Sequence, residues 1–423
     1  MLKIQIKSKE TIRPSSPTSP NLPPIQLSSL DHTSPPIYTH ILLFYSTTTS
    51  TTTITNPLGR LKTSLSSTLT HFFPLAGRIQ PSNSDGTLHV HCTDNGAEFI
   101  EALAEGDLES FLKTSSPIDE FPKLLPIKKD QFKLSEALLA VQVTMFDSGG
   151  HVLGLSMSHL IADGASMAMF LKEWSSISRG TASTGSLPKF DSSSKVFPPQ
   201  PWSALPSSSV EKEEHEEGDQ VSTVAIRRFV IDKDGVETLR SSGREGWRPT
   251  RVEAVSALTW RCLRRAKGDA WENSGAVSQV VNIRKKMAAA LFEEDFGNLW
   301  VDVVVKGEDG RLEEGIREGV RGVDEEYVRR WIEVKEKRER RRSSSSSARS
   351  DWILTSWCRM GFYKSDFGWG EPAWVGCGLR EMKDVCMFID AKDGQGIELW
   401  VWLDADQMTK FETDPELLHF LSN

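Results

Sequence analysis

The sequence predicts two domains that each contain both strands and helices. At 423 residues the chain is too long for one ordinary hydrophobic core, so two domains of about 200 residues each are expected. Strand-like alternation and helical spacing of apolar residues occur in both halves of the chain. A stretch rich in Ser, Pro and acidic residues separates the halves. We therefore expect domains at residues 1–185 and 222–423, joined by a flexible linker at 186–221.

The first domain is expected to begin with a strand and a loop. The opening letters, MLKIQIKSKE, alternate apolar with polar side chains, as a strand does. A Pro- and Ser-rich loop follows, and Ile37–Tyr45 has the composition of a buried strand. A helix comes next and is ended by Pro74. Four leucines at helical spacing define its apolar face: Leu58, Leu61, Leu65 and Leu69.

A histidine and an aspartate lie where a strand is expected to end and a helix to begin. Leu138–Phe146 and the letters HVLGLSMS form a predicted hairpin through a Gly-Gly turn. His159 follows the second strand, Asp163 comes four residues later, and helical periodicity starts at Ala165. A neutral imidazole with a pKa near 6.5 suits a base that deprotonates a hydroxyl. From the motif alone, catalysis and a structural histidine are equally supported, and the aspartate could orient the imidazole or hold the turn.

The same spacing occurs a second time, at His215 and Asp219. Four glutamates flank this histidine, and the surrounding segment belongs to the predicted linker. A segment of such composition has little apolar surface to bury and cannot hold a base against a substrate. We interpret this second copy as accidental.

Regular structure is expected again after the linker. The letters RVEAVSALTWRCLRRA predict an amphipathic helix. The run Glu333–Ser350 mixes charges at helical spacing and then becomes Ser-rich. We interpret it as a solvated helix end followed by a flexible loop, in preference to a phosphate-binding segment.

Composition and missing motifs exclude several classes of protein. The formal charge of −8 argues against general nucleic-acid binding. Five cysteines without metal-ligand spacing are typical of free thiols in a reducing compartment, and no metal site is expected. The opening residues resemble neither a signal nor a transit peptide, and no apolar run suits a membrane helix, so we expect a cytoplasmic protein. P-loop, dinucleotide-binding, serine-hydrolase and zinc-protease motifs are missing as well.

A second motif, in the other half of the chain, narrows the interpretation of the motif that contains His159 and Asp163. Residues 356–372 read SWCRMGFYKSDFGWGEP, and the letters DFGWG are improbable by chance. Together with SHLIADG they resemble the plant BAHD family of acyl-CoA-dependent acyltransferases. The resemblance covers essentially the whole chain, through LTHFFPLAGRI, RVEAVSALTWRCLRRA, VVNIRKKM, DFGNLW and GIELWVWLDADQMTKFETDPELLHFL. It implies an α/β fold of two similar mixed-sheet domains, of the chloramphenicol acetyltransferase-like type, with a channel at their interface.

The resemblance also implies roles for individual residues. His159 matches the family's general base, and Asp163 matches an aspartate that pairs with an arginine, here Arg284. Asp366 is often named beside the histidine as a motif residue, yet the family places its loop away from the reacting atoms, in a structural role. Thr355 and Trp357 match residues that can steady the tetrahedral oxyanion or the acceptor. Three further positions match in the same way: Gly164 as a supporting residue, and Ser256 and Gly368, together with Asp366, as CoA contacts.

The resemblance is greatest to the vinorine synthase subgroup, which implies transfer of acetyl from acetyl-CoA to a hydroxyl of an alkaloid or terpenoid alcohol. We expect a monomer that binds acyl-CoA and a small alcohol as substrates, without a permanently bound cofactor. Two departures bear on the channel wall: the letters KKMAAALFEED replace a proline-rich stretch, and Asp295 replaces a tyrosine. The alternatives are a bulkier aromatic or aliphatic acyl-CoA, a non-catalytic binding homologue, or a hydrolase.

Overall fold

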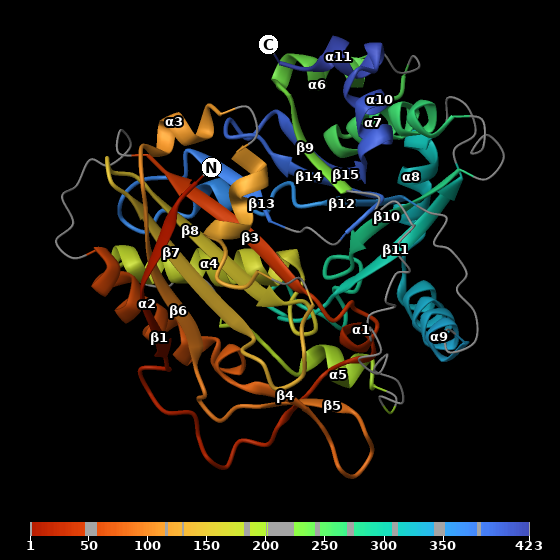
Figure 1. The fold of residues 1–423 in the computed structure, drawn as a ribbon. Helices are drawn as coiled ribbons and strands as arrows, with labels where there is room; N and C mark the ends of the chain where they lie inside the picture. The colour runs from red at the N-terminus through yellow and green to blue at the C-terminus, as the bar shows by residue number, and fades with distance from the viewer. Residues whose placement is uncertain are drawn as a thin grey trace, which may run out of the picture. The chain divides into compact units, whose positions relative to one another are not determined.

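The computed structural model describes residues 2–46, 57–114, 117–128, 131–181, 187–199, 201, 224–241, 246–268, 275–306, 312–341, 352–378 and 382–422. The second histidine–aspartate pair and the predicted Ser-rich loop lie outside these residues, as does most of the predicted linker. Figure 1 shows the elements in chain order. No helix in the described ranges is both long enough and apolar enough to span a membrane.

The chain forms two compact units, and neither is a continuous piece of sequence. Unit 1 comprises Met1–Trp202, Ala288–Leu299 and Met360–Leu379, and unit 2 comprises Ser203–Met287, Trp300–Arg359 and Arg380–Asn423. The change from unit 1 to unit 2 between Trp202 and Ser203 falls within the predicted linker 186–221. Residues 288–299 and 360–379, which the prediction placed in a contiguous domain 222–423, belong to unit 1.

Unit 1 is built on a mixed six-stranded sheet with the order β1-β6-β7-β8-β3-β13. Its pairs are antiparallel except for β6 and β7, which run parallel. A small sheet with the order β2-β5-β4 accompanies it. The strands are β1 Ile4–Ile12, β2 Ile25–Gln26, β3 Tyr38–Tyr45, β4 Arg78–Pro81, β5 Leu88–His91, β6 Ala97–Ala104, β7 Leu139–Phe146, β8 His151–Ser158 and β13 Trp374–Cys377.

The helices of unit 1 follow the predicted periodicity. They are α1 Ser29–His32, α2 Pro57–His71, α3 Leu108–Leu112, α4 Gly164–Arg179 and α5 Ser192–Val196, with 3-10 turns at Phe73–Ala76, Pro117–Leu124 and Phe362–Lys364. Leu61, Leu65 and Leu69 of α2 are fully buried, as the spacing predicts. Helix α2 packs on α4, where Trp174 donates a hydrogen bond from Nε1 to Oγ of Ser64 at 3.0 Å.

The strand β13 completes the main sheet of unit 1 from the second half of the sequence. It pairs antiparallel with β3, with Trp374 opposite Phe44 and Cys377 opposite Ile41. All eight residues of β3 are buried, because β3 lies between β8 and β13 and is covered on both faces. The edge strand β13 comes from a distant part of the chain, so the sequence next to β3 does not reveal it.

Unit 2 contains a second mixed six-stranded sheet, with the order β11-β10-β12-β14-β15-β9. Strands β10, β12 and β14 run parallel, and the outer pairs are antiparallel. The strands are β9 Val224–Ile231, β10 Ala276–Asn282, β11 Trp300–Lys306, β12 Trp352–Ser356, β14 Val385–Asp390 and β15 Ile397–Asp404. The helices are α6 Lys233–Ser241, α7 Arg251–Lys267, α8 Leu312–Arg321, α9 Glu325–Arg341, α10 Ala405–Glu412 and α11 Pro415–Phe420. The two mixed sheets match the predicted fold class.

Candidate active site

His159 is the first residue after β8, an interior strand of the unit 1 sheet. Strand β8 pairs antiparallel with both β3 and β7, so its end is fixed on two sides. The backbone amide of His159 donates to the carbonyl oxygen of Ile37 at 2.8 Å, which continues the pairing past the strand end. The predicted hairpin and strand exit are confirmed. The backbone that carries the His159 side chain is therefore held by a rigid sheet.

Asp163 is the N-cap of α4 and also holds a distant segment of the chain. Its Oδ1 accepts the backbone amide of Ser166 at 2.8 Å, the usual N-cap bond. Its Oδ2 accepts the backbone amide of Leu299 at 3.0 Å. The hydroxyl of Ser166 adds a bond of 2.9 Å to the carbonyl oxygen of Gly297. The start of α4 therefore clamps residues 297–299 beside His159.

Asn298 lies in the clamped segment and contacts the imidazole of His159. Its Oδ1 is 2.9 Å from Nδ1 of His159, and its Nδ2 donates to the backbone carbonyl of His159 at 2.6 Å. An amide oxygen only accepts hydrogen bonds, so Nδ1 of the imidazole carries the proton in this arrangement. In the neutral ring the basic lone pair is then on Nε2.

Burial keeps His159 in its neutral form. The dense protein around the ring lowers its pKa from the ordinary value of 6.5, because the cation would lose solvation. Smaller contributions act in the opposite direction, from a backbone hydrogen bond, the carboxylate of Asp163, the contact with Asn298 and the carboxylate of Asp31. A half-buried neutral imidazole with a defined tautomer is the chemical form that a general base requires.

Asp366 lies at the other end of α4 and stabilises its own loop. Its Oδ1 accepts the backbone amides of Gly368 at 2.7 Å and Gly370 at 2.9 Å. The loop is tied to the last turn of α4, where the hydroxyl of Ser178 donates to the carbonyl oxygen of Phe367 at 2.9 Å and Arg179 donates to that of Asp366. Gly368 has a φ of 105°, a conformation that favours glycine.

Two measures place this loop far from His159. Fifteen residues of helix separate Asp163 from Ser178, a length of about 22 Å at 1.5 Å per residue. The ring of Trp369 lies 4.4 Å from the ring of His151. His151 is the first residue of β8, whereas His159 follows the last residue of that strand. The side chain of Asp366 thus holds a loop that is remote from the imidazole, as the family resemblance implies.

Four of the predicted site residues belong to unit 2. Thr355 lies in β12 opposite Met387, and the backbone amide of Trp357 donates to the carbonyl oxygen of Phe388 at 2.7 Å. Arg284 is 4% exposed and contacts Oδ1 of Asn282 through Nη1 at 3.4 Å. Ser256 of α7 is fully buried and donates to Oε1 of Gln279 at 3.4 Å. Ser256 is thus a core residue of unit 2, and its position does not support the predicted CoA contact.

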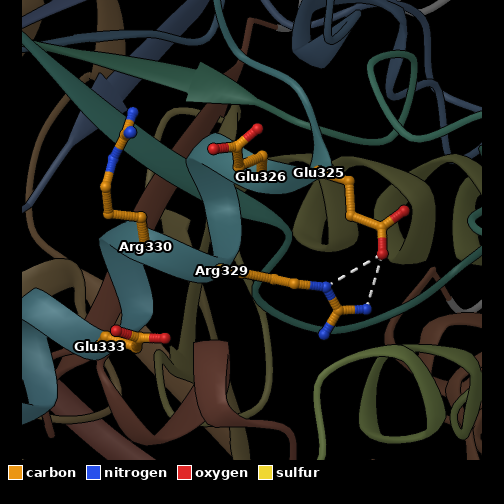
Figure 2. A pocket seen from close by; sticks show the side chains of 5 residues that line it. All are labelled: Glu325, Glu326, Arg329, Arg330 and Glu333. Carbon is orange, nitrogen blue, oxygen red and sulfur yellow. Dashed lines mark hydrogen bonds and ion pairs between the residues drawn. The ribbon is translucent and has the colours of Figure 1, made fainter.

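One hollow among the described residues is formed by a single helix, α9. Figure 2 shows its lining, in which Arg329 of α9 binds Oε1 of Glu325 through Nε at 3.0 Å and Nη2 at 2.7 Å. The lining residues are Glu325, Glu326, Arg329, Arg330 and Glu333. Their opposite charges, one helical turn apart, are typical of a solvated helix face. This hollow offers no chemistry for acyl transfer.

One group of potential metal ligands occurs in the described part of the chain, formed by Cys262, Asp414 and Glu416. The carboxylate of Asp414 binds Arg265 at 2.6 Å and 2.9 Å, and Glu416 binds Arg265 and Arg261. Oδ1 of Asp414 also caps α11, since it accepts the backbone amides of Glu416 and Leu417. Guanidinium groups already supply the positive charge there, so the group is an ion-pair cluster of the α7–α11 contact.

No sequence pattern predicted a role for Asn298 or Asp31 in the active site. Both stand in segments that resemble the family, DFGNLW and LSSLDH, but an asparagine has no local pattern that predicts a catalytic contact. Its partners lie 139 and 267 residues away along the chain. A spatial arrangement of that kind is visible only in the folded chain.

The chain is similar to known proteins over nearly its whole length. A model of the Transferase family matches residues 2–418. A limonoid 21-O-acetyltransferase of Melia azedarach is 33% identical over 434 residues, covering 100% of this chain and 99% of that protein. Salutaridinol 7-O-acetyltransferase of Papaver somniferum is 32% identical over 481 residues, covering 97% and 96%. The crystal structure of vinorine synthase superposes with a TM-score of 0.81 at 27% identity, covering 99% of each chain.

A match over nearly the whole chain and relatives above 30% identity together define the class. The chain belongs to the Transferase family of BAHD acyltransferases, as the two sequence motifs indicated. Its fold is that of the CoA-dependent acyltransferases of the chloramphenicol acetyltransferase-like type. It is an acyl-CoA-dependent acyltransferase, and its similar relatives are plant acetyltransferases.

Proposed function

We propose that the protein is an O-acetyltransferase that moves acetyl from acetyl-CoA to a hydroxyl of a plant specialised metabolite, an alkaloid or a terpenoid alcohol. The observation that carries this proposal is the half-buried, neutral imidazole of His159 with its proton on Nδ1. The choice of acetyl and of these alcohols is supported by relatives named as limonoid and salutaridinol O-acetyltransferases.

In the proposed reaction, His159 is the general base. Its Nε2 takes the proton of the acceptor hydroxyl as the oxygen attacks the thioester carbonyl carbon. The tetrahedral intermediate then breaks the carbon–sulfur bond, and the imidazolium returns the proton to the departing thiolate of CoA. No covalent intermediate on the protein is needed, because a thiolate leaves far more easily than an alkoxide. A positioned base typically contributes about 10²–10⁴-fold to the rate.

The remaining roles are part of the same proposal. Thr355 and Trp357 steady the oxyanion or the acceptor, and Asp163 pairs with Arg284 to hold the turn beside His159. We also propose that the protein acts as a cytoplasmic monomer, which sedimentation analysis and imaging of a tagged chain would test.

The test is a substrate matrix with purified protein. Acetyl-CoA, benzoyl-CoA, coumaroyl-CoA and malonyl-CoA are each incubated with a panel of alkaloid and terpenoid alcohols and amines, and with no acceptor. Thiol release gives the rate, and mass spectrometry identifies the product. We expect an acetyl ester to form with at least one alcohol, and this product to disappear in His159→Ala.

Each rival function has its own outcome in that matrix. Faster transfer of a bulkier acyl group would contradict the acetyl assignment. Thiol release that is independent of any acceptor would identify a hydrolase. Tight CoA binding without thiol release under any condition would favour a binding homologue.

A further inference from the structure

The two oxygens of the buried Asp31 carboxylate accept hydrogen bonds from two different segments of the chain. Its Oδ2 accepts the backbone amide of Ser28 at 2.8 Å and the hydroxyl of Ser28 at 2.6 Å, within the capping box of α1. Its Oδ1 accepts the backbone amide of Asn298 at 2.9 Å and the side-chain Nδ2 of Asn298 at 3.0 Å. Local capping explains the first oxygen. It does not explain the second, whose partner lies 267 residues away.

The contact with Asp31 decides how the amide of Asn298 is oriented. Nδ2 of Asn298 faces two groups that only accept hydrogen bonds, the carboxylate of Asp31 and the carbonyl oxygen of His159. Turning the amide over would place its oxygen against both of these oxygens. Asn298 is fully buried and Asp31 is 2% exposed, so water cannot relieve that repulsion. The amide oxygen is therefore directed at Nδ1 of His159.

We propose that Asp31 is a positioning residue of the active site: through Asn298 it fixes the proton of His159 on Nδ1 and so leaves the basic lone pair on Nε2. The chain of contacts is carboxylate to amide to imidazole, at 3.0 Å and 2.9 Å. A neutral amide between the carboxylate and the ring keeps the imidazole a base, since it accepts the Nδ1 proton without carrying a charge itself. This inference rests on the proposed function of His159 as the base.

The same carboxylate acts on the charge that develops during the reaction. As Nε2 takes up the hydroxyl proton, the imidazole becomes cationic in a site that disfavours the cation. The negative charge of Asp31 opposes that effect across one hydrogen-bonded residue, and Asp163 does so from the helix start. Removal of Asp31 therefore affects both the tautomer and the energy of the imidazolium.

The test compares three variants with the wild-type protein. Asp31→Ala removes the acceptor that orients the amide, and Asn298→Ala removes the amide. Ser28→Ala is the matched control, because it breaks the capping box and leaves the contact between Asp31 and Asn298 in place. Nitrogen-15 chemical shifts of labelled histidine report the tautomer, and His159→Ala identifies the resonances that belong to His159. kcat, KM and thermal unfolding are measured on the same proteins.

We expect wild-type His159 to be protonated at Nδ1, and Asp31→Ala and Asn298→Ala to populate the Nε2-protonated tautomer. Both variants should lose on the order of 10²-fold in kcat with KM within about threefold, as expected when a base is mispositioned. The double variant should be no slower than Asn298→Ala alone, because the two residues act through one contact. Ser28→Ala should lower the unfolding temperature and leave the tautomer unchanged.

Several outcomes would overturn the proposal. Protonation of wild-type His159 at Nε2 would do so without any variant. An unchanged tautomer in Asp31→Ala, or equal losses of kcat in Asp31→Ala and Ser28→Ala, would assign Asp31 a purely structural role. The nuclear magnetic resonance measurement needs no substrate. If the tautomer is as expected but no acyl transfer is found, the proposed function fails and the positioning of His159 stands.

Discussion

The Oδ2 atom of Asp163 accepts a hydrogen bond from the backbone amide of Leu299 at 3.0 Å, although 136 residues separate the two. The other oxygen of the same carboxylate caps α4 through the amide of Ser166. One side chain therefore fixes both the helix that follows His159 and the segment that brings Asn298 to it. Loss of this carboxylate disturbs the geometry of the base without removing the base.

Asp163→Ala is expected to lower the free energy of unfolding by about 2–4 kcal/mol, because it removes a helix cap and leaves a buried amide unsatisfied. Asp163→Asn keeps one acceptor and should lose about half as much. The matched control is Asp107→Ala, which removes the exposed N-cap of α3, bound to the amide of Ser110 and the hydroxyl of Ser148, and should cost clearly less than Asp163→Ala. Chemical denaturation measures all three. Equal losses in Asp163→Ala and Asp107→Ala would show that the bond to Leu299 contributes nothing.

Arg284 is predicted to be the ionic partner of Asp163. If the two side chains pair, Arg284→Ala should resemble Asp163→Ala in stability and in kcat, and the double variant should lose less than the sum of the single variants. A double-mutant cycle on the free energy of unfolding measures this coupling. Strictly additive losses would mean that the two residues do not meet.

Asp366→Ala is expected to cost stability and to leave the chemistry nearly unchanged. Its carboxylate oxygen satisfies two amides of the loop, so its removal should cost about 1–3 kcal/mol. The loop is held at the far end of α4, so kcat per folded molecule should stay within about threefold at a temperature where the variant is folded. The concentration of folded protein is measured by a method that does not depend on activity, so that a loss of stability is not read as a loss of kcat. A loss of kcat comparable with that of His159→Ala would give this aspartate a direct catalytic role.

The sequence predicted those features that depend on neighbouring residues. The hairpin before His159, the helix after it and the leucine face of α2 follow from local periodicity, and the structure has them at nearly the predicted bounds. The predicted strand Leu138–Phe146, for example, is Leu139–Phe146 in the structure. Local patterns of this kind are determined by the alternation of a strand or the turn of a helix.

Features that depend on distant pairing were not predicted. Strand β13 joins the sheet of unit 1 from the second half of the chain, because its partner β3 offers an edge that no local pattern reveals. Asn298 contacts His159 and Asp31 because Asp163 and Ser166 clamp its segment to α4. The pattern of apolar and polar residues states which face of an element is buried, but not which distant segment covers it.

Replacing His159 with alanine should lower kcat by about 10²–10⁴-fold and leave CoA binding nearly intact, because the base is lost and the fold is kept. The chain supplies its own control in His215→Ala, which has the same spacing to an aspartate in a segment rich in Glu and Ser. That control should change kcat and KM by no more than about twofold, because a segment of this composition has little apolar surface to bury and cannot hold a base against a substrate. Steady-state kinetics and calorimetric titration with CoA measure both. A large loss in the control would show that the spacing of the motif, and not its place after β8, carries the activity.

The acid limb of the pH–rate profile should have its midpoint below pH 6.5. Burial lowers the pKa of His159 from that value, and only the neutral imidazole can accept the hydroxyl proton. Activity should therefore be level near neutral pH and should fall only as the pH drops through the lowered pKa. Asp163→Asn removes a carboxylate that favours the cation and should move the midpoint further down.

The free energy of unfolding should also depend on pH through His159, and the direction of this dependence follows from the lowered pKa. Because the folded chain binds this proton more weakly than the unfolded chain, the contribution of His159 is fully present above pH 6.5 and is lost as the pH falls below it. The loss levels off once the pH is below the folded-state pKa. Denaturation curves of wild-type protein and His159→Ala between pH 4.5 and 8 isolate this contribution as their difference. A midpoint of the acid limb at or above pH 6.5, or a difference that grows as the pH rises above 6.5, would contradict the assignment of a half-buried neutral base.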